Sequence, residues 1–209
     1  MNRLKQKKQL LKNKLITLDD NQTETLFKFE ELIKNYNKKT NLISYNDLDK
    51  IWERHFLDSL EILKVLSKAN VSHETFKETK WADMGSGAGF PVIPLCIALP
   101  NINFCAIEVR LKRATFLKVA KKELNLSNLK IVQKRIESCK INNFDVVTSR
   151  ALGSADEDWF LAKNLLKKAG VFITLKKANH FLEETALWER HQYSLDSEKE
   201  EFCVLLRWS

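Results

Sequence analysis

Apolar side chains recur at helical spacing through the first eighty residues. Within residues 21–39 the stripe consists of Leu26, Phe29, Ile33 and Tyr36. A comparable stripe continues through residues 46–68, and this period predicts amphipathic helices. The opening segment "MNRLKQKKQLLKNKL" sets leucines among lysines, which predicts a further helix that packs its leucines on the body of the protein. We therefore expect residues 1–79 to form a helical region.

The pattern changes at Lys80, where short apolar runs begin to alternate with helical stretches. The runs that read as strands are residues 81–84, 103–109, 129–134, 144–150, 170–176 and 202–208. Helices are expected after the first run as far as Ile97, over residues 111–124 and around Trp159–Lys168. Such alternation predicts an α/β fold with a doubly wound, mostly parallel sheet and helices on both faces. Residues 80–209 are expected to form this Rossmann-like domain, with residues 1–79 packed on it as part of one structural unit.

The segment "DMGSGAGFPVIP", residues 83–94, joins the first predicted strand to the following helix. Its glycines, Gly85, Gly87 and Gly89, allow positive φ angles and let a ligand approach the backbone closely. Pro91 and Pro94 fall near the first turn of the helix, where a missing N–H costs least. The pattern is typical of a nucleotide-binding strand-to-helix loop, and a tight turn without a ligand is the alternative.

Two acidic residues narrow the choice of ligand. Asp83 stands where a dinucleotide-binding fingerprint usually has an apolar residue, and Glu108 ends the next predicted strand. A carboxylate at the second position can accept hydrogen bonds from both hydroxyls of a ribose. The Lys-Ser/Thr pair of a phosphate-binding P-loop is absent from the segment. These features favour S-adenosylmethionine over a nucleotide bound through its phosphates.

The charge balance indicates an anionic partner. The chain has 35 Lys and Arg against 27 Asp and Glu, a net charge of +8, which favours nucleic acid although a merely lysine-rich protein is the alternative. Three basic clusters are candidates for contacting it: the N-terminal lysines, the 112–122 helix, and Lys134 with Arg135. The four cysteines show no metal-ligand spacing, so we expect no metal site and a reducing compartment. We also expect no membrane span and a cytoplasmic location.

A family resemblance rests on several segments in order. They are "NYNKKTNLIS", "RHFLDSL", "DMGSGAGFPVIPL", "EVRLKRATFL", "RIE" and "FDVVTSRAL". Over residues 36–152 the chain resembles the ribosomal RNA small subunit methyltransferase G family, also called the glucose-inhibited division protein B family. The resemblance implies a class I S-adenosylmethionine-dependent methyltransferase fold of seven strands. It also implies methylation of guanine N7 in 16S rRNA, at position 527 in the 530 loop.

The resemblance also assigns the cofactor site. It places S-adenosylmethionine against Gly85 and Phe90, then Ile136 and Glu137, then Arg150, while Glu108 replaces the family's usual aspartate. With the rest of the glycine loop, the expected cofactor-binding residues are Gly85, Ser86, Gly87, Gly89, Phe90, Glu108, Ile136, Glu137 and Arg150. The chain departs from the family pattern at Val92, Val109 and Leu111, and the C-terminal third resembles it only loosely. We expect the departures to alter the cofactor pocket slightly.

The methyl acceptor can be narrowed from the residues themselves. The loop after the fourth predicted strand, "SRALGS", offers no cysteine for attack on a pyrimidine, and no Asn/Asp-Pro-Pro-aromatic segment is present for an exocyclic amine. Guanine N7 carries a lone pair and no proton, so its methylation needs no general base and rests on orientation and electrostatics. Arg150 is the one candidate catalytic residue, orienting the target or the cofactor, with an ion pair to a helix carboxylate as the alternative.

Other functions stay open at this level. A methyltransferase acting on a small molecule or protein, a nicotinamide-dependent oxidoreductase and a nucleic-acid-binding module would each fit part of the pattern. The expected partner under the main hypothesis is 16S rRNA, in the small ribosomal subunit or an assembly intermediate of it. The family suggests a monomer.

Overall fold

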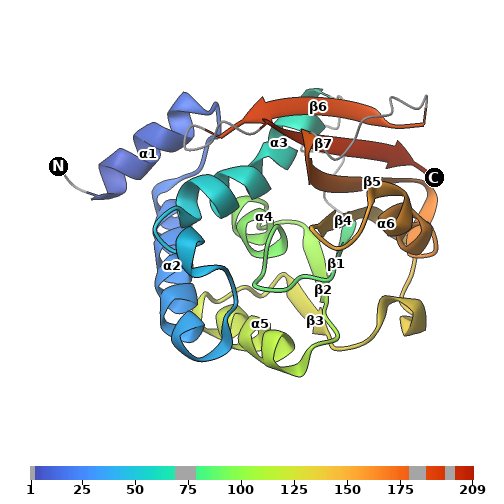
Figure 1. Cartoon of the computed structure of the whole chain (residues 1–209), viewed down its shortest axis with the longest axis horizontal. Coiled ribbons are helices and arrows are strands. Elements are labelled where there is room, and N and C mark those ends of the chain that lie inside the picture. The colour runs from blue at the N-terminus through green and yellow to red at the C-terminus, as the bar shows by residue number, and fades with distance from the viewer. Residues whose placement is uncertain (1–2, 69–78, 179–186, 196–200) are drawn as a thin grey trace.

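A seven-stranded sheet runs through the centre of the computed structural model, which describes residues 3–68, 79–178, 187–195 and 201–209 (Figure 1). The strands are β1 (Lys80–Met84), β2 (Asn103–Ile107), β3 (Leu129–Val132), β4 (Phe144–Arg150), β5 (Leu166–Lys177), β6 (Glu189–Ser194) and β7 (Glu201–Trp208). Their order across the sheet is β3-β2-β1-β4-β5-β7-β6. The first five are parallel, and β7 pairs antiparallel with both β5 and β6. The predicted mostly parallel sheet is confirmed.

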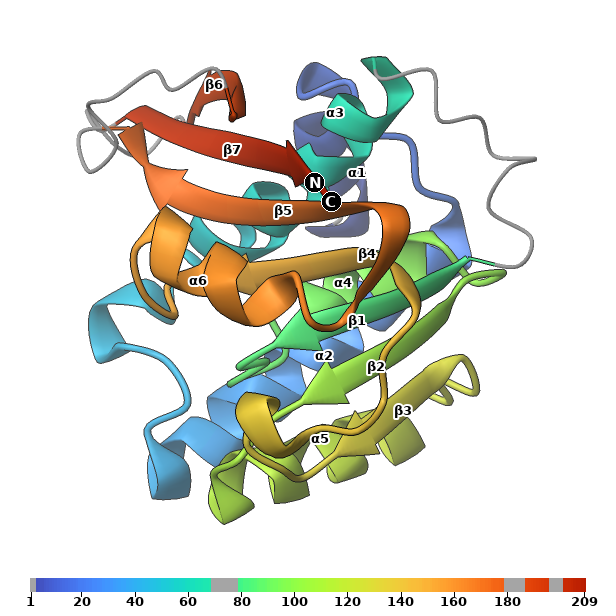
Figure 2. The same cartoon turned by 90° about the vertical axis from the view of Figure 1, so that its right-hand side faces the viewer.

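Helices cover both faces of the sheet, as expected. They are α1 (Arg3–Asn13), α2 (Asp20–Thr40), α3 (Asp58–Lys68), α4 (Val92–Ala98), α5 (Leu111–Glu123) and α6 (Ala155–Ala162). Figures 1 and 2 place α6 on one face and α2, α4 and α5 on the other. The N-terminal helices contact the sheet domain through α2 against α4 and α5, and through α3 against α4 and β7.

The central strands of the sheet contribute side chains to two apolar cores, one on each face. On β1, Trp81 enters the larger core beneath the N-terminal helices, whereas Ala82 and Met84 enter the smaller core beneath α6. In the larger core the ring of Phe29, on α2, contacts three rings from other elements: those of Phe56, Phe90 and Phe116. The helical stripe read from the sequence therefore buries itself directly against the glycine loop.

The ends of α2 are fixed by their sequence. Asp19 and Gln22 form a reciprocal capping box at its start, and the Gln22 amide also donates to the carbonyls of Ile97 and Ala98 at the end of α4. At the other end Asn41 adopts a left-handed conformation with φ of 43°, which an Asn tolerates at a helix C-terminus. These contacts anchor α2 to the sheet domain and turn the next segment toward the carboxyl ends of the strands.

The structure corrects three local expectations. Residues 46–68 do not form one helix: a 3-10 turn (Tyr45–Asp47), a π-helical turn (Trp52–Leu57) and then α3 follow one another. The helix expected at Trp159–Lys168 begins and ends earlier, because a capping box at Ser154 starts α6 and β5 already begins at Leu166. Strand β6 is not evident from the sequence, because its residues are mostly polar.

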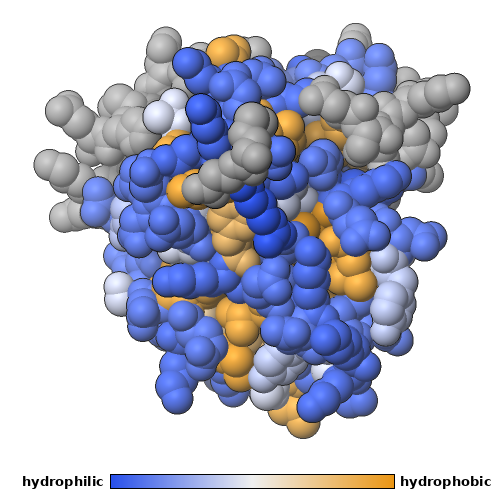
Figure 3. Space-filling view, turned by 90° about the vertical axis from the view of Figure 1, so that its left-hand side faces the viewer, coloured by the Kyte–Doolittle hydropathy of each residue, from blue (hydrophilic) through white to orange (hydrophobic). Residues whose placement is uncertain are grey.

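The N-terminal helix matches its prediction. Leu11 is buried and Leu10 packs against the same core, while the outer surface on this side of the molecule is mainly hydrophilic (Figure 3). Cys96 and Cys105 are buried as small core residues, as expected. Among the described helices none has the length and apolar character needed to cross a membrane.

Candidate functional site

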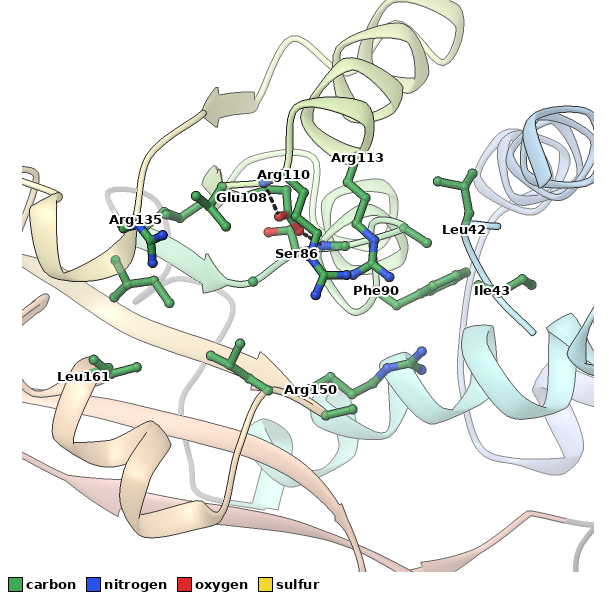
Figure 4. A pocket seen from close by; sticks show the side chains of 18 of the residues that line it. Leu42, Ile43, Ser86, Phe90, Glu108, Arg110, Arg113, Arg135, Arg150 and Leu161 are labelled. Atoms are coloured by element: carbon green, nitrogen blue, oxygen red, sulfur yellow. Dashed lines mark hydrogen bonds between the residues drawn. The ribbon is translucent and has the colours of Figure 1, made fainter. Parts of the chain in front are cut away.

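A cavity of about 520 Å³ opens at the carboxyl ends of β1, β2 and β4 (Figure 4). In open α/β sheets this edge is where ligands bind. One part of its lining comes from the sheet domain, through the glycine loop, the end of β2 and the segment after β3. Another comes from the helical region, through Leu42, Ile43, Ser44, Asp47 and His55. The two regions described from the sequence thus share one cavity.

The glycine loop has a backbone that other residues would strain. Gly85 has a φ of 64°, and a Cβ added there would lie 2.8 Å from Cδ1 of Leu152, which also lines the cavity. The backbone N–H groups of Gly85 and Ser86 both donate to the carbonyl of Ile107 at the end of β2. The loop is therefore held against β2, and its backbone at Gly85 borders the cavity without a side chain in between.

Glu108 joins this loop to the end of β2. Its Oε2 accepts a hydrogen bond from the N–H of Gly87 at 2.8 Å, and its Oε1 accepts one from the N–H of Arg110 at 2.8 Å. A carboxylate has about four acceptor positions, so two remain for a ligand. Figure 4 shows Glu108 beside Ser86 and Arg110 at the lining of the cavity.

Asp83 lies behind the glycine loop rather than in the lining of the cavity. It is fully buried, Thr148 donates a hydrogen bond to its Oδ1, and Oδ2 has no partner among the described residues. Burial raises the pKa of this carboxyl to about 7. The residue that distinguishes the loop from a dinucleotide site therefore lies in the core, where its side chain bonds to β4.

The segment after β3 forms another part of the cavity lining. It contains a 3-10 turn (Ile136–Ser138), and both Ile136 and Glu137 line the cavity. Ile136 packs on the smaller core, whereas Glu137 is exposed. These two residues are assigned to the cofactor by the resemblance, and the fold brings them to the same cavity as Glu108.

Arg150, at the end of β4, connects the sheet to the helical region. Its guanidinium donates to Asp58 at 2.9 Å and to the carbonyl of Arg54 at 3.4 Å, and it lies 2.7 Å from Nδ1 of His55. The same guanidinium sits over the ring of Phe90, 5.0 Å from its centroid, and Figure 4 shows it reaching toward Phe90. Arg150 therefore forms the ion pair with a helix carboxylate that was the expected alternative, and it also lines the cavity.

The partners of Arg150 do not follow from the sequence pattern. On a regular helix Arg54–Asp58 and His55–Ser59 would be neighbouring pairs, whereas Arg150 contacts His55 and Asp58, which lie three residues apart. Tyr193 of β6 also donates to Asp58, and no feature of its strand signals this role. The motif "RHFLDSL" is the available signal, but its contacts depend on the tertiary fold.

His55 is a neutral imidazole in this setting. Its ring stacks on Phe90 with centroids 4.7 Å apart, and burial, with Arg150 and Arg54 nearby, lowers its pKa to about 2. The described residues contain no group of three His, Cys, Asp or Glu side chains that could hold a metal ion.

The basic clusters separate in space. Arg113, Lys134 and Arg135 line the cavity together with Arg110, whereas Lys118, Lys121 and Lys122 line a different groove on α5. In the N-terminal segment, three basic residues form intramolecular ion pairs, among them Arg3–Glu30, Lys7–Glu53 and Lys8–Asp20. One basic group therefore surrounds the cavity, and it draws on two of the predicted clusters.

Most of the expected cofactor residues meet at the cavity. Gly85, Ser86, Gly87, Phe90, Glu108, Ile136, Glu137 and Arg150 all line it. Gly89 does not, and a Cβ there would instead meet Ile93 and Phe29. Of the departures from the family pattern, Val92 is buried in the core and Leu111 is exposed, so neither lines the cavity; only Val109 does. The expected alteration of the pocket is thus confined to Val109.

Comparison of sequences identifies relatives of this chain. Residues 22–207 match the family model described as rRNA small subunit methyltransferase G, GidB. The protein named ribosomal RNA small subunit methyltransferase G from Oceanobacillus iheyensis is 36% identical over 174 residues, covering 80% of this chain and 70% of that protein. The protein of the same name from Cereibacter sphaeroides is 33% identical over 192 residues, covering 88% and 89%.

Comparison of structures addresses the fold. A SAM-dependent methyltransferase from Aquifex aeolicus superimposes with a TM-score of 0.55 at 15% identity, covering 78% of this chain and 98% of that one. A SAM-dependent O-methyltransferase from Thermotoga maritima gives a TM-score of 0.54 at 16% identity, covering 86% and 71%. These likenesses confirm the expected class I methyltransferase fold.

Proposed function

The chain belongs to the rRNA small subunit methyltransferase G family of S-adenosylmethionine-dependent enzymes, and from that premise we propose that it methylates guanine N7 in 16S rRNA, at position 527 in the 530 loop. The observation that carries the proposal is the shared cavity: the residues expected to hold the cofactor and the basic residues expected to hold RNA line the same opening. A methyl donor and an anionic acceptor would meet there.

The residues around the cavity fit S-adenosylmethionine. A Cβ at position 85 would occupy the space beside Gly85, so the loop stays open only with glycine there. Glu108 accepts two backbone hydrogen bonds and keeps further acceptor positions for the two ribose hydroxyls. Ile136 offers an apolar contact beside the adenine, and Glu137 a polar one. The cofactor would supply an activated methyl group on a sulfonium.

The protein's own contribution would be orientation. Guanine N7 presents a lone pair without a proton, so no side chain has to remove one, and catalysis rests on alignment and local electrostatics. Arg150 holds Phe90 and His55 in fixed positions through its stacking and hydrogen bond. We assign Arg150 the role of a positioning residue that fixes His55, on the helical region, relative to Phe90, in the glycine loop.

The RNA would approach over the basic residues that surround the cavity. Lysine and arginine contacts to phosphates dominate such affinity, and Arg110, Lys134 and Arg135 are exposed there. The deep major groove of A-form RNA hides N7, so an unpaired or displaced guanine is the substrate. We propose that the substrate is the small ribosomal subunit or an assembly intermediate of it in the cytoplasm, and that the enzyme acts as a monomer.

A reconstituted reaction tests the proposal. The purified chain is incubated with methyl-labelled S-adenosylmethionine and either naked 16S rRNA or small subunits from cells that lack the enzyme, and the digested nucleosides are identified by mass spectrometry. Label in 7-methylguanosine is the expected result. Label in another nucleoside, or in protein alone, would overturn it. The Glu108→Ala variant is the matched control for contaminating methyltransferases.

A further inference from the structure

Two polar side chains of the helical region line the cavity without bonding to each other. They are His55, on the π-helical turn, and Asp47, at the end of the preceding 3-10 turn. Nε2 of His55 and Oδ2 of Asp47 are 3.7 Å apart, which is beyond a hydrogen bond. Neither residue is among those expected to hold the cofactor, so this pair is left for the acceptor.

The chemistry of the pair is fixed by its neighbours. Since Nδ1 of His55 faces the Arg150 guanidinium at 2.7 Å, Nδ1 accepts and the neutral ring carries its proton on Nε2. That Nε2 is buried and has no partner among the described residues, although the His55 residue as a whole is 7% exposed. An unpaired buried donor costs free energy unless a ligand satisfies it. Asp47 is held from its other side by Arg54, 3.5 Å away.

We propose that Asp47 and His55 recognise the Watson–Crick edge of the target guanine. His55 Nε2–H donates to guanine O6, and the Asp47 carboxylate accepts from N1–H. Adenine has an amino donor in place of O6 and an acceptor at N1. Its amino group would therefore face the Nε2–H donor of His55, and its N1 would face the Asp47 carboxylate, so neither hydrogen bond could form. Neither bond uses N7, which stays available for methyl transfer. The inference rests on the proposed function and adds the basis of its specificity for guanine.

The test pairs one substitution with one base analogue. Small subunits are reconstituted with 16S rRNA that carries guanine or 2-aminopurine at the methylated position; 2-aminopurine keeps N7 but lacks both O6 and N1–H. The wild-type enzyme is expected to prefer guanine in kcat/KM. Asp47→Asn keeps an acceptor oxygen but loses the charge, so it should reduce that preference by about five- to tenfold, the difference between a hydrogen bond to a charged group and one to a neutral group, while its Kd for S-adenosylmethionine stays within about twofold.

Two further variants complete the design. Asp49→Asn makes the same chemical change two residues away, at an exposed position outside the cavity lining, and should keep the wild-type preference. Asp47→Glu retains a carboxylate and should recover most of the preference that Asp47→Asn loses. An unchanged guanine preference in Asp47→Asn, or a Glu variant as indifferent as the Asn variant, would overturn the inference.

Failure of the proposed function has a different signature. In that case the wild-type enzyme methylates neither RNA, or the product is not 7-methylguanosine, and the specificity proposal falls with it. If the wild-type enzyme methylates guanine N7 but Asp47→Asn discriminates as well as wild type does, only the role of Asp47 and His55 is removed.

Discussion

At the scale of single residues, Glu108 links the glycine loop, the end of β2 and the cavity. Its position was predictable because a carboxylate that ends the second strand of such a fold faces the ligand edge of the sheet. Its two backbone hydrogen bonds were not, because they depend on how the loop turns back toward it. The side chain therefore organises the loop, and we propose that it also offers acceptors to a ribose.

Glu108→Ala is expected to weaken binding of S-adenosylmethionine by about ten- to a hundredfold, the value of one or two hydrogen bonds to a charged group. Isothermal titration calorimetry measures the change, and Glu108→Asp should restore most of the affinity. Glu123→Ala, at the exposed end of α5, is the matched control. Equal affinities for the Glu108→Ala and Glu123→Ala proteins would remove Glu108 from the cofactor site.

Asp83 gives a pH dependence of stability with a defined sign. Its folded pKa of about 7 lies above the ordinary value of 3.8, so the unfolded chain releases this proton first as pH rises. The contribution of Asp83 to the free energy of unfolding therefore falls between about pH 4 and pH 7. Each pKa unit is about 1.4 kcal/mol, which makes the decrease between about pH 5 and pH 7 on the order of 3 kcal/mol.

Asp83→Asn should remove this dependence. Measured by urea unfolding, the stability of the variant relative to wild type is expected to be higher at about pH 8 than at about pH 5. Asp49→Asn, an exposed carboxyl changed in the same way, should show no such trend. A constant difference between Asp83→Asn and wild type across the window would contradict the burial-raised pKa.

At the scale of elements, the turns between regular segments determine the site. Apolar residues predicted nearly every helix and strand from β1 onward: helical spacing marks helices that bury one face, and continuous apolar runs mark strands that are buried on both faces. They did not predict the π-helical turn at Trp52–Leu57, because such turns are rare and have no residue signature of their own. The sequence pattern at His55 and Asp58 indicates helix packing, because their contacts with Arg150 join residues more than ninety positions apart.

The glycine loop allows a direct test of its backbone. Gly89 has a φ of 92°, and a Cβ there would lie 2.6 Å from Cδ1 of Ile93 and 3.2 Å from Cζ of Phe29. Gly89→Ala is therefore expected to lower the free energy of unfolding by about 2 kcal/mol or more, through both left-handed strain and overpacking. Chemical denaturation measures it.

The control for this substitution is Gly153→Ala. A Cβ at Gly153 would come no closer than 3.1 Å to the side-chain oxygens of Asp158 and Glu157, so a smaller decrease is expected. The prediction is that Gly89→Ala lowers the free energy of unfolding more than Gly153→Ala does. The opposite order would show that the loop does not require the conformation described.

At the scale of the whole molecule, the fold class and the position of the cavity were predictable, but the basic face that we propose for RNA was not. Charge runs in the sequence indicate three equivalent basic clusters. The fold divides them, because N-terminal residues such as Lys7 pair with carboxylates within the protein, while residues from the other two clusters surround the cavity. The C-terminal strands resemble the family least, yet Tyr193 of β6 reaches the Arg150 network through Asp58.

This division predicts how RNA affinity responds to salt. Removing two basic residues beside the cavity, Arg110→Ala with Arg135→Ala, should weaken RNA binding and lower the slope of log K against log salt by about 0.7–0.9 for each phosphate that is no longer neutralised. Fluorescence anisotropy at several salt concentrations measures both. The matched pair Lys118→Ala with Lys122→Ala, on the separate groove, should leave the slope unchanged, and equal slopes for the two pairs would contradict the assignment.

The central claim, that this chain places a methyl group on guanine N7 of 16S rRNA from the cavity at Glu108, is tested most directly in cells. N7-methylguanine is mapped along 16S rRNA by chemical cleavage and sequencing in cells that lack the gene, with and without a plasmid copy of it. The account predicts that the modification at position 527 disappears on deletion, returns with the wild-type chain, and returns at most weakly with Glu108→Ala. An identical modification map with and without the chain would contradict it.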